Sequence, residues 1–136
     1  RAKVTVGVQI VGEIGAGSLV LVGVTHDDTP AQAAKLADKI WKLRIFDDVD
    51  GVMNLSLADT SREVLVVSQF TLYGDTRKGR RPGYTEAARP EHAEPLVDAV
   101  VRELRSLGAT VRTGKFQAEM AVEMVSDGPI TLLVEV

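Results

Sequence analysis

The feature that most constrains this fold is a run of four apolar residues, 64–67, followed at once by polar side chains. Consecutive valine and leucine side chains are typical of a strand that is buried on both faces. Ser68, Gln69 and Thr71 then carry polar groups. Polar groups at the end of a buried strand are either hydrogen-bonded locally or exposed in a cleft. We therefore predict that residues 68–71 form one wall of an active site.

The remaining chain alternates predicted strands with two predicted helices. Thr29 and Pro30 suit the cap and the first residue of one helix, and Gly108 suits the end of the other. Residues 3–14 alternate in polarity and run towards a hairpin near residues 7–12. We expect further strands at 19–24, 54–57, 63–72, 110–113, 116–124 and 130–136, and helices from 30 to between 43 and 46 and at 91–107. This order predicts a mixed α and β class, with a sheet or barrel packed against two helices.

Length and composition exclude several classes of site. A chain of 136 residues fits one domain, which we expect to span residues 1–136. The chain contains no cysteine and two histidines, which excludes disulfides and argues against thiolate or multi-histidine metal sites. We therefore expect no metal and no cofactor. No apolar run approaches the ~18 residues of a membrane span, and we see no signal peptide, so we expect a cytoplasmic protein without a membrane partner.

Two further stretches allow more than one interpretation. Four cations stand within five positions at Arg77, Lys78, Arg80 and Arg81, in a chain with a formal net charge of −3. They form either a solvated loop or a local contact with phosphate groups. The dipeptide Gly128-Pro129 is either a simple turn between strands or a rigid pair of carbonyls aimed at a ligand.

A catalytic triad is not supported. The chain has no Gly-x-Ser-x-Gly elbow, and neither His26 nor His92 has a recognisable context. If residues 68–71 catalyse a reaction, the backbone N–H groups of Phe70 and Thr71 are the better candidates, because such donors hold a developing oxyanion.

Taken together, residues 68–72 (SQFTL) and 128–131 (GPIT) resemble the two signature motifs of the D-aminoacyl-tRNA deacylase family. The resemblance covers essentially the whole chain. It implies a homodimer with a β-barrel-like fold and two helices. It also implies hydrolysis of the ester that joins a D-amino acid, or mischarged glycine, to tRNA. Supporting stretches follow the family's order at residues 12–17, 43–46, 51–55 and 81–84.

The resemblance assigns the catalytic wall to Ser68, Gln69, Phe70 and Thr71. It implies that Gly128-Pro129 is a cis pair that crosses the dimer interface and faces this wall in the partner subunit. There its backbone would block an L-side chain while a D-side chain points to solvent. Two mechanisms stay open, with either Thr71 or the ribose 2′-OH of the tRNA taking part. The second is favoured because no base lies near Thr71 in the sequence.

In this reading the basic residues Arg77, Lys78, Arg80 and Arg81 contact the aminoacyl-tRNA. Two departures from the family pattern stand out. Ser126 replaces the family's asparagine, and the family's first strand, whose arginine supports the Gly-Pro loop, has no counterpart, so we expect that an N-terminal segment is missing.

Two alternatives to the editing hydrolase remain open. One is a non-catalytic dimeric α/β binding module in which residues 68–71 merely cap a strand. The other is an esterase of small free esters, which would act without tRNA.

Overall fold

The structure, a computed structural model, describes residues 1–136. Its elements in chain order are β1 (Ala2–Val6), β2 (Gln9–Ile14), β3 (Gly17–Val22), α1 (Pro30–Lys42), β4 (Phe46–Asp47), β5 (Met53–Leu55), β6 (Glu63–Ser68), the 3₁₀-helix η1 (Phe70–Tyr73), α2 (Pro90–Leu107), β7 (Val111–Thr113) and β8 (Ala121–Met124). The strands form an antiparallel sheet β2-β1-β8, a parallel sheet β3-β6-β7 and a small antiparallel pair β4-β5. The mixed class with two helices is confirmed, but these sheets are open and do not close into a barrel.

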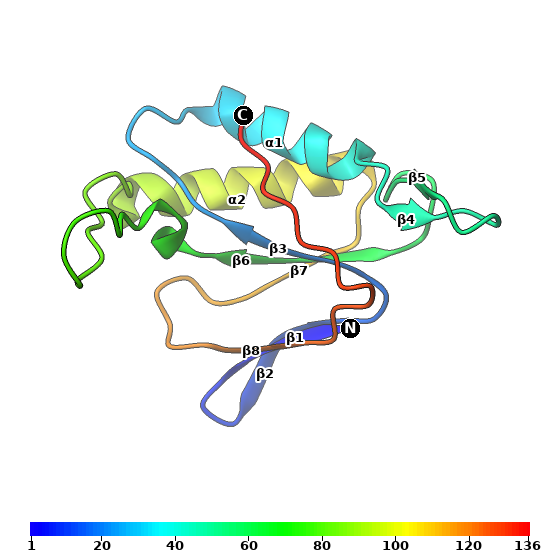
Figure 1. Ribbon diagram of the computed structural model, residues 1–136, viewed down its shortest axis with the longest axis horizontal. Coiled ribbons are helices and arrows are strands. Elements are labelled where there is room, and N and C mark those ends of the chain that lie inside the picture. Colours follow the sequence, from blue (N-terminus) through cyan, green and yellow to red (C-terminus); the bar gives the residue numbers. More distant parts are fainter.

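The parallel sheet lies between two layers (Figure 1). Helices α1 and α2 cover one of its faces, and the antiparallel sheet lies against the other. The middle strand β6 serves both sides, because Val64 and Val66 belong to the core beneath the helices while Leu65 and Val67 belong to the core shared with β1 and β2. Full burial of each such side chain contributes about 1.5–3 kcal/mol. The prediction that residues 64–67 are buried on both faces is confirmed.

Local signals predict the start of α1 and the end of α2 correctly, whereas α1 ends one residue before the predicted range of 43–46 and α2 begins one residue before the predicted position 91. Thr29 caps α1 by accepting a hydrogen bond from the Ala31 N–H at 3.3 Å, and Pro30 is the first helical residue. Helix α2 ends at Gly108, whose φ of 112° is left-handed. Neither helix is long and apolar enough to cross a membrane.

The two sheets meet at Gly12 in β2. A Cβ atom added there would lie 2.2 Å from the carbonyl oxygen of Thr113, the last residue of β7. Only glycine therefore permits this approach of the two backbones. The contact brings the antiparallel sheet close to the carboxyl ends of the parallel strands, where the candidate site begins.

Several predicted strands are corrected by the structure. Residues 130–136 form no strand and have no backbone hydrogen bonds, although their β-branched and leucine side chains favour one. They run as an exposed segment from near the N-terminus towards α1 (Figure 1). A strand needs hydrogen bonds to a neighbouring backbone, and this segment makes none within the chain. Consequently the turn at Gly128-Pro129 does not join two strands, and only Ala121–Met124 of the predicted strand 116–124 pairs with β1.

Candidate active site

The loop after β6 is built on the parallel sheet. Gln69 N–H donates to the Val22 carbonyl at 2.8 Å, which extends the pairing of β6 with β3 by one residue. The chain then turns into η1, so the predicted continuation of the strand to residue 72 is wrong. Leu72 N–H closes the first turn by donating to the Gln69 carbonyl at 3.2 Å. The N–H groups of Phe70 and Thr71 precede this bond and have no partner within the turn.

The side chains of this loop differ in exposure. Ser68 and Gln69 are half-buried, whereas Phe70 and Thr71 are exposed. The Gln69 side-chain amide donates to the Thr71 hydroxyl. No titratable side chain makes a hydrogen bond to Thr71, so no base in this chain is placed to activate its hydroxyl.

Close approach of a glycine positions η1 against β3. A Cβ added to Gly23 would lie 3.1 Å from the Leu72 Cβ and 3.2 Å from the Tyr73 ring. The absence of a side chain at position 23 therefore lets the 3₁₀-helix pack directly on the end of β3. No residue of η1 is buried, so its position depends on a small number of contacts.

Ser68 also borders a small pocket of about 70 Å³ between β6, β7 and α2. Asp98 of α2 and Lys115, which follows β7, place charged groups around it. Sequence reasoning missed these two residues. The signal was the parallel pairing of β6 with β7, because the carboxyl ends of parallel strands meet at the same edge of a sheet. The complete lining is Val66, Ser68, Val97, Asp98, Val101, Thr113, Gly114, Lys115 and Phe116.

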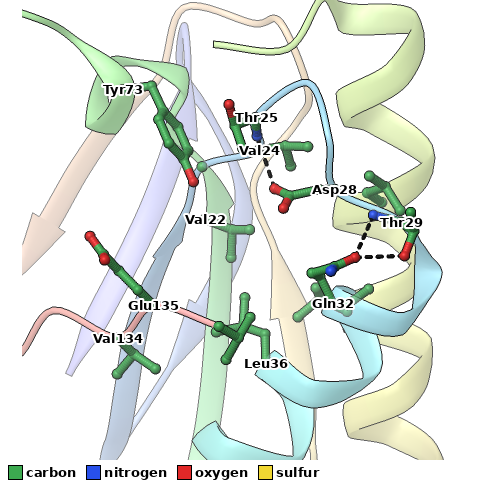
Figure 2. Close-up of a pocket in the computed structure, with 15 residues that line it drawn as sticks. Val22, Val24, Thr25, Asp28, Thr29, Gln32, Leu36, Tyr73, Val134 and Glu135 are labelled. Atoms are coloured by element: carbon green, nitrogen blue, oxygen red, sulfur yellow. Dashed lines mark hydrogen bonds between the residues drawn. The ribbon is translucent and has the colours of Figure 1, made fainter. Parts of the chain in front are cut away.

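A second pocket, of about 240 Å³, lies between the end of β3, the start of α1 and the C-terminal segment. Figure 2 shows Tyr73 and Glu135 on one side of it and Gln32 on the other. Burial, and then the negative charges of Asp28 and Glu135, raise the pKa of the Tyr73 phenol. None of residues 68–71 lines this pocket, so it is separate from the predicted wall.

The four predicted tRNA-binding cations lie on a closed loop, which we call the basic hairpin (residues 75–83). Asp75 and Gly83 exchange two backbone hydrogen bonds of 2.7 and 2.8 Å at its base. Arg77 folds back onto Asp75, with an Nη2–Oδ2 distance of 2.8 Å. Hydrogen bonds from the Arg77 side chain and backbone lower the pKa of Asp75 to about 2. Lys78, Arg80 and Arg81 are exposed and make no ion pair.

The basic hairpin is joined to the candidate wall by an aromatic contact. The rings of Phe70 and Tyr84 meet edge to face, with centroids 5.1 Å apart and an interplanar angle of 67°. Tyr84 directly follows the hairpin, and Phe70 is the first residue of η1. The structure thus brings the catalytic and tRNA-binding residues predicted from the sequence into one region of the chain.

The remaining predicted residues, Gly128 and Pro129, lie elsewhere. Their peptide bond is cis, and Gly128 has a φ of 131°. Both residues are exposed, and the three atoms nearest to a Cβ added to Gly128 all belong to Ile130. The turn follows β8 on the N-terminal side of the molecule, away from η1 (Figure 1). Within one chain, therefore, Gly128-Pro129 and residues 68–71 do not form a common site.

Comparison with solved proteins identifies the fold. The structure resembles the c-Myc DNA Unwinding Element Binding Protein with a TM-score of 0.93 and 36% sequence identity, over 99% of this chain and 92% of that chain. The two proteins therefore share one class of fold, in which two helices cover one face of a parallel sheet and an antiparallel sheet packs on the other.

Sequence comparison is more specific. The profile of the family described as D-Tyr-tRNA(Tyr) deacylase matches residues 1–135. The D-aminoacyl-tRNA deacylase of Symbiobacterium thermophilum is 55% identical over 135 residues, which are 99% of this chain and 89% of that protein. The enzyme of the same name from Geobacillus is 58% identical over the same length, with the same coverage. This chain belongs to the D-Tyr-tRNA(Tyr) deacylase family, which confirms the resemblance drawn from its motifs.

Proposed function

We propose that this chain is a tRNA-editing hydrolase that acts as a single domain of residues 1–136. It cleaves the ester of D-aminoacyl-tRNA, and of glycine mischarged on tRNA, and it spares L-aminoacyl-tRNA. The family match over nearly the whole chain supports this activity. The observation that carries it is the position of η1, whose first residue, Phe70, contacts Tyr84 directly after the basic hairpin with its three unpaired cations.

The chemistry assigned to this wall is modest. Water attacks the carbonyl carbon of the ester, and the ribose 3′ oxygen leaves. The negative charge that develops on the carbonyl oxygen is held by the N–H groups of Phe70 and Thr71, each worth roughly 3–4 kcal/mol in the transition state. The 2′-OH of the same ribose assists the proton transfer. The Thr71 hydroxyl is held by Gln69 and has no adjacent base, which supports a route through the main chain.

Selectivity in this proposal comes from a second copy of the chain. In a homodimer, Gly128-Pro129 of one subunit faces residues 68–71 of the other, and its backbone rejects an L-side chain. Residues 126–136 are almost entirely exposed and make no backbone hydrogen bond within the chain. Exposed apolar side chains at Ile130, Leu132 and Leu133 add surface that a partner subunit would cover. These observations support the assignment of this segment to an interface.

The basic hairpin is assigned to the tRNA backbone. Lys78, Arg80 and Arg81 present charge to solvent, and phosphate contacts of this kind position a nucleic acid without reading its sequence. We assign the enzyme to the cytoplasm, because its proposed substrate, aminoacyl-tRNA, is formed there.

The test is a deacylation assay with D-Tyr-tRNA, L-Tyr-tRNA and Gly-tRNA in parallel. The proposal expects rapid release from the D-aminoacyl and glycyl substrates and almost none from the L-aminoacyl substrate. Equal release from the D- and L-substrates, or none from either, would sink it; the second result would favour a non-catalytic binding module. Turnover of small free esters at the rate seen with tRNA would point instead to a general esterase.

A further inference from the structure

The two ends of the basic hairpin are fixed to different parts of the fold. Immediately before the hairpin, Gly74 N–H donates to the Thr71 carbonyl at 2.9 Å, so the hairpin starts directly after η1. At its base, Asp75 and Gly83 close the loop through two backbone hydrogen bonds. The hairpin is therefore connected through this base to Gly74 and Tyr84, the residues that flank it.

The backbone that follows Tyr84 is held by the loop between β3 and α1. The Thr25 hydroxyl donates to the Glu86 carbonyl at 2.6 Å, and the His26 ring lies 2.6 Å from the Thr85 carbonyl. Ala88 N–H donates to the Val24 carbonyl at 2.9 Å. These bonds hold the main chain on the carboxyl side of Tyr84. This hydrogen-bonded backbone supports the Tyr84 side chain.

From this support the Tyr84 ring reaches the exposed surface of η1. It meets the Phe70 ring at 5.1 Å, and a Cβ added to Gly74 would lie 3.1 Å from the Tyr84 ring. Phe70 is still 54% exposed and Tyr84 41% exposed, so each ring covers part of the other without entering the core. Since η1 has no buried residue, this contact is one of few that set the orientation of its first N–H groups.

We propose that Tyr84 is a positioning residue for the deacylation reaction. Its ring couples the basic hairpin, which holds the tRNA backbone, to the Phe70 and Thr71 N–H groups, which hold the ester. Binding of tRNA to the hairpin and orientation of the oxyanion donors then become one event. This inference rests on the proposed function and adds to it a residue that makes no contact of its own with the ester.

The experiment compares Tyr84→Leu with Tyr84→Phe, since only the second keeps the ring. Deacylation of D-Tyr-tRNA is measured over a range of substrate concentrations. We expect Tyr84→Leu to lower kcat by about 10- to 100-fold while KM changes little, because small misplacement of catalytic groups is costly. Tyr84→Phe should keep kcat close to that of the original chain, because it retains the ring. Phe46→Leu is the matched control. Phe46 lies on β4, outside the site, and the substitution removes the contact of its ring with Arg62, at 4.5 Å.

A second measurement does not depend on activity. Amide hydrogen exchange of residues 69–74 is followed in the same variants, and faster exchange is expected in Tyr84→Leu only. An unchanged kcat in Tyr84→Leu, equal impairment of Tyr84→Phe, or unaltered exchange would overturn the coupling. If the original chain does not deacylate D-Tyr-tRNA, the proposed function fails, and exchange alone decides the coupling. If Tyr84→Leu does not fold, exchange is compared between Phe70→Leu and the original chain, with the same expected increase and the same overturning result.

Discussion

The two segments that carry the predicted site are held in opposite ways. The wall at residues 68–71 is anchored inside the chain, through the Gln69–Val22 hydrogen bond, the close packing on Gly23 and the contact with Tyr84. Residues 126–136 have no backbone hydrogen bond and are almost entirely exposed.

This difference separates what one subunit achieves alone from what requires another surface. The wall is ready to offer its N–H groups in an isolated chain. The segment with Gly128-Pro129 has no comparable backbone hydrogen bonds within its own chain. In the proposed dimer, its orientation would depend on the partner subunit. Catalysis and stereoselectivity are thus assigned to regions with different sources of rigidity, and the following variants test that division.

The largest effect is expected from a side chain at the exposed segment. Gly128→Val places a side chain where Gly128 would face the partner's pocket, so deacylation of D-Tyr-tRNA should fall by about 100-fold or more. Circular dichroism checks the folding of the variant, because valine is strained at a φ of 131°. Gly7→Val is the matched control, since Gly7 also has a positive φ, of 61°, and open space around it. Equal losses in both variants would contradict the placement of Gly128 in the partner's site.

The next effect concerns the unpaired cations of the anchored region. Replacing Lys78, Arg80 and Arg81 by glutamine should weaken binding of tRNA and reduce its logarithmic salt slope by about 2 to 3. Arg77→Gln is the informative comparison. Because Arg77 already pairs with Asp75, the loss of Arg77 should change the salt slope much less. Binding titrations at several salt concentrations measure both variants. Identical slopes for all of the proteins would remove the hairpin from the tRNA interface.

A smaller effect is expected at Thr71, inside the wall. Thr71→Ala removes the hydroxyl that Gln69 holds but leaves the main-chain donor in place. Activity on D-Tyr-tRNA should fall by less than about tenfold if the main chain carries the oxyanion. Single-turnover kinetics provide the measurement, with circular dichroism as the check on folding. A loss as complete as in an unfolded sample would restore Thr71 as the nucleophile.

The smallest effect is the influence of pH on the contact between Asp75 and Arg77 at the base of the hairpin. Because its hydrogen bonds with Arg77 lower the pKa of Asp75 to about 2, this contact stabilises the fold fully above the ordinary carboxyl pKa of about 3.9. Its contribution is lost as the pH falls from about 4 towards 2. An NMR titration of the Asp75 carboxyl should therefore give a midpoint near 2 in the original chain. In Arg77→Gln the midpoint should return towards 3.9, and an unchanged midpoint would assign the shift to another cause.

The same contrast explains which parts of the fold could be predicted from the sequence. Thr29 and Gly108 act on their own neighbours, so both helix boundaries were predictable from local patterns. The apolar run at residues 64–67 indicated a buried strand, because both faces of that strand are covered. Residues 130–136 carry a strand pattern, but pairing depends on a distant partner that no local pattern reveals.

The candidate site shows the same limit. The polar end of β6 and the cations at residues 77–81 were visible in the sequence, because each is a contiguous motif. The neutralisation of Arg77 by Asp75 and the ring contact of Tyr84 with Phe70 depend on how the loop folds back. Spacing alone does not determine that path.

The three unpaired cations at the end of the basic hairpin also affect events before contact. The chain as a whole carries a net charge of −3, so these cations would attract a polyanion against the overall charge of the protein. That attraction acts over a Debye length of roughly 10 Å at 0.1 M salt. In the proposed function, an approaching tRNA would be turned towards the hairpin while it is still diffusing. The charge of the hairpin should then affect the rate of association more than the lifetime of the complex.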